Sequence, residues 1–123
     1  DRHFLFETNM VSEPLHLNEF IFSLTSKGYR PVLAHPERYQ YMTTEKAADL
    51  RQRGVKLQVN MLSLIGYYGP TIQKLAGKLI ENKIVDVLGS DCHNLDHAHL
   101  LKKVQTSRLY EKALTLPLLN HAL

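Results

Sequence analysis

Short apolar segments alternate with amphipathic segments along this chain, and that alternation restricts the fold more than any other feature. The apolar segments recur roughly every 25 to 30 residues, a spacing typical of βαβ units. The segments between them place apolar residues at helical spacing, as in Leu17, Phe20, Ile21 and Leu24. We therefore predict strands over 3–7, 31–35, 55–60 and 84–89, and helices over 15–27, 44–54, from 70 onward and over 96–114.

Apolar strands separated by helices pair in parallel and are covered by those helices, so the fold class is α/β with parallel (β/α) repeats. A doubly wound sheet and a (β/α) barrel both satisfy this pattern, and four units are about half of a barrel of ~250 residues. No Gly-x-Gly-x-x-Gly turn or Walker loop follows a strand, which disfavours nucleotide binding. The 123 residues, without an obvious linker, predict a single domain over 1–123.

Composition excludes several classes of partner. The net charge is +3, and no run of Lys or Arg exceeds two residues, so no nucleic-acid partner is expected. No apolar segment approaches the ~20 residues of a membrane helix, so no membrane insertion is expected. The single cysteine, Cys92, rules out an intramolecular disulfide framework and fits a cytoplasmic location.

Polar residues of metal-ligand type stand at the ends of the predicted strands. Glu7 ends the first strand, His35 the second and Asn60 the third, and Asp91 and His93 follow the fourth. Because the carboxyl ends of parallel strands meet at one edge, these side chains are expected to converge. Carboxylate and imidazole together suit divalent ions such as Mn, Fe or Zn, which can activate water and bind a phosphoryl group. Taken alone, Glu7 is better explained as a solvated strand end and His35 as a hydrogen-bonded loop histidine; the combination with Asp91 and His93 favours a metal site.

Arg38 lies three residues after His35, across Pro36. Proline biases the preceding residue toward an extended conformation, so we predict an extended His35 followed by a defined turn. The turn would direct Arg38 toward the site, where a guanidinium binds two phosphate oxygens. The alternative is a surface arginine paired with Glu37. A cysteine-based phosphatase is rejected, because Ala98 stands six residues after Cys92 where that chemistry requires arginine.

Two motifs carry a resemblance to a known family. They are Val-Leu-Ala-His-Pro-Glu-Arg-Tyr over 32–39 and Gly-Ser-Asp-Cys-His-Asn over 89–94. With Phe6-Glu7, Val-Asn-Met over 59–61 and Ile-Gly-Tyr-Tyr-Gly over 65–69, they resemble the PHP family, and most closely its bacterial tyrosine-protein phosphatase branch of capsular and exopolysaccharide synthesis.

This resemblance implies a distorted (β/α)7 PHP-type barrel that holds about three metal ions, most commonly manganese. It implies that Glu7 is a bridging carboxylate, that His35, Asp91 and His93 are metal ligands, and that Arg38 binds the substrate phosphate. The implied reaction is metal-dependent hydrolysis of phosphotyrosine, and the implied partner is a phosphotyrosine protein such as a bacterial tyrosine kinase that controls polysaccharide export.

Two departures from the family pattern affect these expectations. The family's N-terminal His-x-His strand is absent, so we expect this chain to be the C-terminal half of a PHP barrel with little turnover alone. The family's arginine after Asp-x-His is also absent, and His97 or His99 would supply its charge. Alternatives left open are a small-molecule phosphatase of the histidinol-phosphatase type, and a non-catalytic binding module that forms a homo-oligomer through its open sheet edge.

Overall fold

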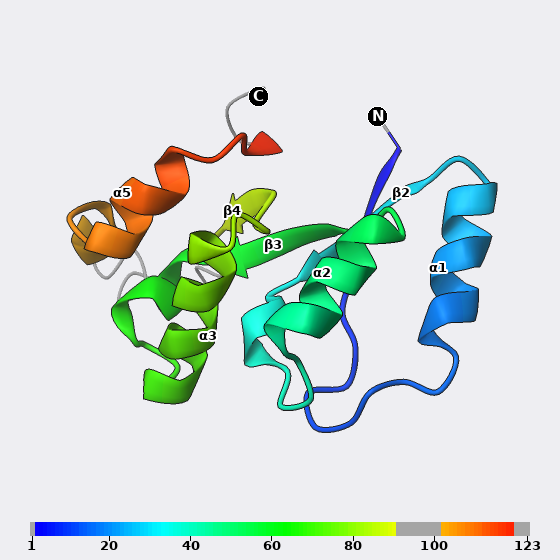
Figure 1. The fold of residues 1–123 in the computed structure, drawn as a ribbon, viewed down its shortest axis with the longest axis horizontal. Coiled ribbons are helices and arrows are strands. Elements are labelled where there is room, and N and C mark those ends of the chain that lie inside the picture. Colours follow the sequence, from blue (N-terminus) through cyan, green and yellow to red (C-terminus); the bar gives the residue numbers. More distant parts are fainter. Residues whose placement is uncertain (1, 91–101, 120–123) are drawn as a thin grey trace.

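The computed structural model describes residues 2–90 and 102–119, which form a parallel sheet flanked by helices (Figure 1). Neighbouring strands pair in chain order, β1-β2-β3-β4, and all three pairings are parallel. The α/β class with parallel repeats is therefore confirmed. The strands are β1 (His3–Phe6), β2 (Arg30–Ala34), β3 (Lys56–Asn60) and β4 (Val87–Gly89).

One helix follows each of the first three strands, and Figure 1 shows these helices in chain order across the molecule, with the last helix beside α3. None of the helices in the described ranges is both long and apolar enough to cross a membrane. The α-helices are α1 (Leu17–Ser26), α2 (Thr44–Gln52), α3 (Pro70–Glu81) and α5 (Arg108–Leu114), and two 3-10 helices, η1 (Pro36–Arg38) and η2 (Met61–Ile65), follow β2 and β3.

Local signals in the sequence explain where these helices begin and end. The Thr43 hydroxyl accepts a hydrogen bond from the Lys46 amide, which caps α2 at its N-terminus. Pro70 occupies the first turn of α3, where its missing N–H costs nothing. Apolar residues from α3, among them Leu79 and Ile80, are buried in the same core cluster as Leu57 of β3. The helices thus cover the sheet and leave its carboxyl edge for polar groups.

Two helix predictions need correction. The helix predicted over 15–27 begins only at Leu17, and Phe20 is 41% exposed instead of buried; its ring packs edge-on against Phe6 with centroids 5.4 Å apart. The single helix predicted over 96–114 is wrong within the described residues. The chain is helical over 102–105, turns at Thr106, and starts α5 afresh after Ser107, whose hydroxyl accepts from the Tyr110 amide.

The fourth strand is shorter than predicted because Asp86 interrupts it. The buried Asp86 carboxylate accepts two hydrogen bonds from Arg51, at 3.0 and 2.8 Å, and a third from the Leu57 backbone amide at 3.0 Å. A side chain thereby accepts from a backbone amide of β3, and regular pairing begins only at Val87. Asp86 thus joins α2 to the sheet at the start of β4.

We predict that Asp86→Ala lowers the free energy of unfolding by about 3 kcal/mol, since it leaves the Leu57 amide and the Arg51 guanidinium without their acceptor. Urea unfolding would measure the loss. The matched control is Asp49→Ala, which removes the exposed Asp49–Arg53 pair and should cost less than about 0.5 kcal/mol. Equal losses from the two variants would contradict this account of Asp86.

Candidate functional site

A polar pocket of about 170 Å³ lies at the carboxyl ends of all four strands. The convergence of strand ends predicted from the sequence is therefore confirmed for Glu7, His35 and Asn60. Ser90, which directly follows β4, also lines the pocket. The remaining lining residues are Leu5, Ala34, Gln58 and Gly89.

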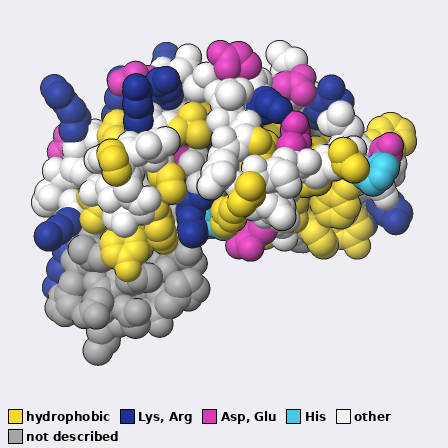
Figure 2. Space-filling view, turned by 90° about the horizontal axis from the view of Figure 1, so that it is seen from below, with side chains coloured by type: hydrophobic (Ala, Val, Ile, Leu, Met, Phe, Trp, Pro, Cys, Tyr) yellow, Lys and Arg dark blue, Asp and Glu magenta, His cyan; other side chains and the backbone are white. Residues whose placement is uncertain are grey.

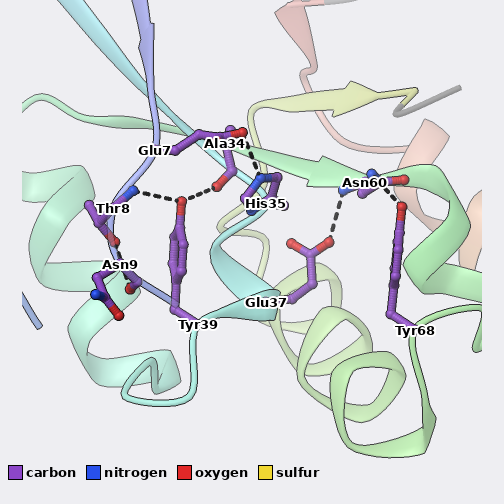
Figure 3. Close-up of polar contacts among 9 residues, drawn as sticks. All are labelled: Glu7, Thr8, Asn9, Ala34, His35, Glu37, Tyr39, Asn60 and Tyr68. Carbon is purple, nitrogen blue, oxygen red and sulfur yellow. Dashed lines mark hydrogen bonds and ion pairs between the residues drawn. The ribbon is translucent and has the colours of Figure 1, made fainter. Parts of the chain in front are cut away.

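Glu7 and His35 are in direct contact in this pocket. The Oε1 atom of Glu7 lies 3.0 Å from the Nε2 atom of His35 (Figure 3). The two side chains differ in environment, because 65% of the Glu7 side chain is exposed and only 9% of the His35 side chain is. The carboxylate therefore faces solvent, while the imidazole is held by the protein.

This pair fits the binding of a divalent cation. Carboxylate oxygen and imidazole nitrogen are donors that divalent ions accept, and Oε1 and Nε2 lie 3.0 Å apart, close enough for both to bind one ion. In addition, the Nδ1 atom of His35 is buried without a hydrogen-bond partner among the described residues. One carboxylate and one imidazole form only a partial site. The described part of the chain contains no group of three or more His, Cys, Asp or Glu residues arranged to hold a metal.

The backbone of His35 differs from the prediction. We expected an extended residue before Pro36, but His35 has φ 36° and ψ 59°, in the left-handed region. This conformation costs a non-glycine residue about 1 to 3 kcal/mol. The tertiary structure imposes it: the His35 amide donates to the Gln58 carbonyl at 2.7 Å, while Pro36 starts η1. Such strain at a strand end is typical of functional sites.

The Tyr39 hydroxyl joins the two chain segments that carry Glu7 and His35. It donates to the Ala34 carbonyl at 2.9 Å and accepts from the Thr8 amide at 3.2 Å (Figure 3). The residue is only 2% exposed, and burial raises the pKa of its phenol to about 12. Tyr39 therefore acts as a neutral bridge that fixes the end of β1 against the end of β2.

Glu37 forms a second bridge, between β2 and β3. Its Oε2 atom accepts from the Asn60 amide at 3.0 Å (Figure 3). The same atom accepts from the Ser63 hydroxyl at 2.6 Å. Burial raises the pKa of this carboxyl, and the hydrogen bonds from Ser63 and Asn60 act in the opposite direction. Glu37 thereby holds the loop after β2 against the end of β3 and against η2.

Arg38 lies beside the polar pocket, in a neighbouring groove. Its guanidinium carbon is 4.2 Å from the centroid of the Tyr68 ring. The groove has a volume of about 470 Å³ and passes Gly69 and Thr71 at the start of α3. Arg38 does not line the pocket that contains Glu7 and His35. Its expected role in phosphate binding stays a prediction.

The remaining predicted site residues lie outside the described part of the chain. These are the metal-ligand candidates Asp91 and His93 and the substrate-binding candidates His97 and His99; Cys92 lies there as well. Sequence reasoning missed the bridging roles of Tyr39 and Glu37. Both lie in the motif that follows His35, but nothing in their spacing reveals which backbone groups they reach.

Comparison with known proteins gives a consistent result. The family model for capsular polysaccharide synthesis proteins, CpsB/CapC, matches residues 1–112. The chain is 29% identical over 104 residues to CapC of Staphylococcus aureus, which is named as a tyrosine-protein phosphatase. It is 28% identical over 96 residues to the tyrosine-protein phosphatase YwqE of Bacillus subtilis. These alignments cover 83% and 76% of this chain.

The chain also resembles a solved structure from a study of YwqE of Bacillus subtilis and CpsB of Streptococcus pneumoniae, described as metal-dependent tyrosine phosphatases. The TM-score is 0.72 at 27% identity, over 94% of this chain and 53% of the other. The chain spans about two fifths of the length of the two curated relatives, 41% and 38%. These matches confirm the resemblance that the two motifs indicated.

The left-handed backbone of His35 leads to a stability prediction. His35→Gly and His35→Ala both remove the imidazole, but glycine adopts positive φ without strain, so the glycine variant should be more stable by about 1 kcal/mol. Thermal and urea unfolding would compare them. The control is Ala34→Gly in β2, where glycine should instead lower stability by about 0.5 to 1 kcal/mol. An alanine variant as stable as the glycine variant would refute strain at His35.

The Tyr39 bridge leads to a second prediction. Tyr39→Phe should lower the free energy of unfolding by about 1 to 3 kcal/mol, because the buried Ala34 carbonyl and the Thr8 amide lose their partner. The control is Tyr29→Phe, which removes a hydroxyl from an exposed ring and should change stability by less than about 0.5 kcal/mol. If both variants unfold alike in urea, the hydroxyl does not hold the strand ends together.

Proposed function

Because the chain belongs to the capsular polysaccharide synthesis CpsB/CapC family, we propose that it supplies part of the active site of a metal-dependent protein-tyrosine phosphatase. The single observation that carries the proposal is the Glu7–His35 contact in a polar pocket at the strand ends. The names of the relatives support the phosphotyrosine substrate, and the family description supports a role in capsule and exopolysaccharide synthesis.

Four residues are proposed as metal ligands: Glu7, His35, Asp91 and His93. Glu7 would supply an exposed carboxylate, and the family resemblance implies that this carboxylate would bridge two ions. Manganese is the proposed metal, with iron and zinc as the alternatives that the same donors accept. Bound divalent ions would lower the pKa of a coordinated water and offset the negative charge of the phosphoryl group. The buried His35 would keep its imidazole fixed in front of the ions.

Arg38 is proposed to bind the phosphate of the substrate. Arg38 ends η1, which begins directly after His35. The groove that contains Arg38 therefore lies near the carboxyl end of β2. A planar guanidinium can donate two parallel hydrogen bonds to phosphate oxygens and so orient the ester for attack. His97 and His99 are proposed to add positive charge on the substrate side. The protein partner would be a phosphotyrosine protein such as a tyrosine kinase in the cytoplasm.

We further propose that this chain is the C-terminal half of a distorted (β/α)7 PHP-type barrel. The sequential strand order supports this, since a doubly wound sheet reverses its order at a switch point. Exposed apolar side chains also gather near β1 and α1, and Figure 2 shows hydrophobic atoms at the α1 end of the molecule. Further barrel units would cover such a surface. The exposed apolar side chains of this surface include Phe4, Leu5, Leu15, Phe20 and Phe22.

The test compares this chain with a version extended at its N-terminus, both loaded with Mn²⁺. We expect phosphotyrosine peptide hydrolysis by the extended protein and little by the short chain. His35→Ala and Asp91→Ala should lower bound metal in elemental analysis, whereas Arg38→Ala should keep the metal and raise KM. Glu7→Ala should also lower bound metal, and its control is Glu13→Ala, which only removes a surface pair with Lys46.

Two results would overturn this proposal. The first is unchanged metal content after both ligand substitutions in the extended protein. The second is hydrolysis of small phosphate esters with no turnover of phosphopeptide, which would indicate a small-molecule phosphatase. Strong turnover by the short chain would refute only the proposal that it is an incomplete half.

A further inference from the structure

Tyr68 lies between the polar pocket and the groove that contains Arg38. The central carbon of the Arg38 guanidinium lies over the Tyr68 ring, 4.2 Å from the ring centroid. At the other end of the ring, the hydroxyl lies 3.4 Å from the Asn60 side-chain nitrogen, which donates to it (Figure 3). Asn60 itself lines the pocket that contains Glu7 and His35. One aromatic side chain thus contacts residues of both parts of the site.

We propose that Tyr68 is a positioning residue that orients the Arg38 guanidinium toward the substrate phosphate. This inference rests on the proposed phosphate-binding role of Arg38. It assigns to Tyr68 a function that none of the sequence motifs indicated.

A guanidinium group can contact an aromatic ring and a phosphate at the same time. A tyrosine ring attracts the face of a guanidinium group through its π electrons. Phosphate oxygens bind instead at the edge of the guanidinium, in the plane of its N–H groups. The contact with the Tyr68 ring therefore restricts the conformations of the long Arg38 side chain. Less ordering remains to be achieved when substrate binds.

Tyr68 can act in this way because it is itself held in place. Its ring packs edge-on against Tyr67, with centroids 5.1 Å apart and planes at 86°. The Asn60 side chain is fixed in turn, since its Oδ1 atom accepts from the Leu62 amide at 2.9 Å and the residue is only 4% exposed. The position of the Arg38 stacking partner is therefore fixed relative to the end of β3. Asn60 thus lines the pocket with the proposed metal ligands Glu7 and His35 and also contacts the stacking partner of Arg38.

The test measures binding, so it does not depend on turnover by this chain. The probe is a fluorescein-labelled peptide that carries a non-hydrolysable phosphonate analogue of phosphotyrosine, and its Kd is measured by fluorescence anisotropy with Mn²⁺ present. The variants are Tyr68→Leu, Tyr68→Phe, Arg38→Ala and the double variant Arg38→Ala/Tyr68→Leu. The matched control is Tyr29→Leu, which removes a second Arg–Tyr stack, that of Arg2 at 4.6 Å, outside the proposed site.

Loss of the ring in Tyr68→Leu should raise the Kd about three- to tenfold, the range of a partly exposed cation–π contact. Tyr68→Phe keeps the ring and should stay within about twofold of the parent chain, as should Tyr29→Leu. In the Arg38→Ala background, Tyr68→Leu should add no further weakening, because its effect passes through Arg38. A merely structural role for Tyr68 would instead weaken binding equally in both backgrounds.

Each other outcome overturns a defined part of the argument. If Arg38→Ala weakens binding and Tyr68→Leu does not, Tyr68 has no positioning role and the proposed function stands. Equal weakening by Tyr68→Leu with and without Arg38 also overturns the positioning role alone. If Arg38→Ala leaves the Kd unchanged, the phosphate-binding role of Arg38 fails, and the positioning role fails with it. If neither the parent chain nor the N-terminally extended protein binds the peptide, the phosphate-binding role of Arg38 and the positioning role of Tyr68 both fail.

Discussion

Parallel pairing of the four strands in chain order is the constraint from which the site follows. The register places Phe6 beside Leu33, Ala34 beside Gln58 and Asn60 beside Gly89, so every strand ends at the same edge. Glu7, His35 and Ser90, which directly follow β1, β2 and β4, and Asn60, the last residue of β3, therefore line one pocket. Glycine at position 89 lets the Gln58 side chain lie close to the end of β4, because a Cβ there would come within 2.7 Å of that side chain. Backbone pairing, rather than attraction between the polar groups, brings them together.

Side-chain bridges then fix the loops that the sheet has brought together. The Tyr39 hydroxyl joins the ends of β1 and β2, and the Glu37 carboxylate joins the loop after β2 to the end of β3. These bridges also explain how His35 can remain in a left-handed conformation. Strain of about 1 to 3 kcal/mol persists only where the surroundings over-determine the backbone. Here hydrogen bonds on both sides of His35 do so.

The sequence predicts the periodic part of this molecule well. Apolar spacing predicts the four strands and the helices between them, and the polar strand ends predict that Glu7, His35 and Asn60 share a pocket. Prediction from the sequence fails where a hydrogen bond to a side chain takes the place of regular backbone pairing. Asp86 shortens β4 and Ser107 starts a new helix, both through hydrogen bonds to specific backbone amides. The left-handed His35 escapes prediction because tertiary contacts outweigh the local preference of a residue before proline.

The separation between Arg38 and the polar pocket follows from the same architecture. Glu7 and His35 reach the pocket directly from strand ends, whereas Arg38 sits one residue beyond the buried Glu37, at the end of η1. Because Glu37 is fixed to the Asn60 amide, the backbone before Arg38 is tied to β3, and the Arg38 side chain meets Tyr68 from the loop after β3. The pocket with Glu7 and His35 and the groove with Arg38 are therefore adjacent, and β3 fixes their relative positions. Such a division suits the proposed reaction, in which the phosphoryl oxygens of the substrate would face the proposed metal ions and the Arg38 guanidinium.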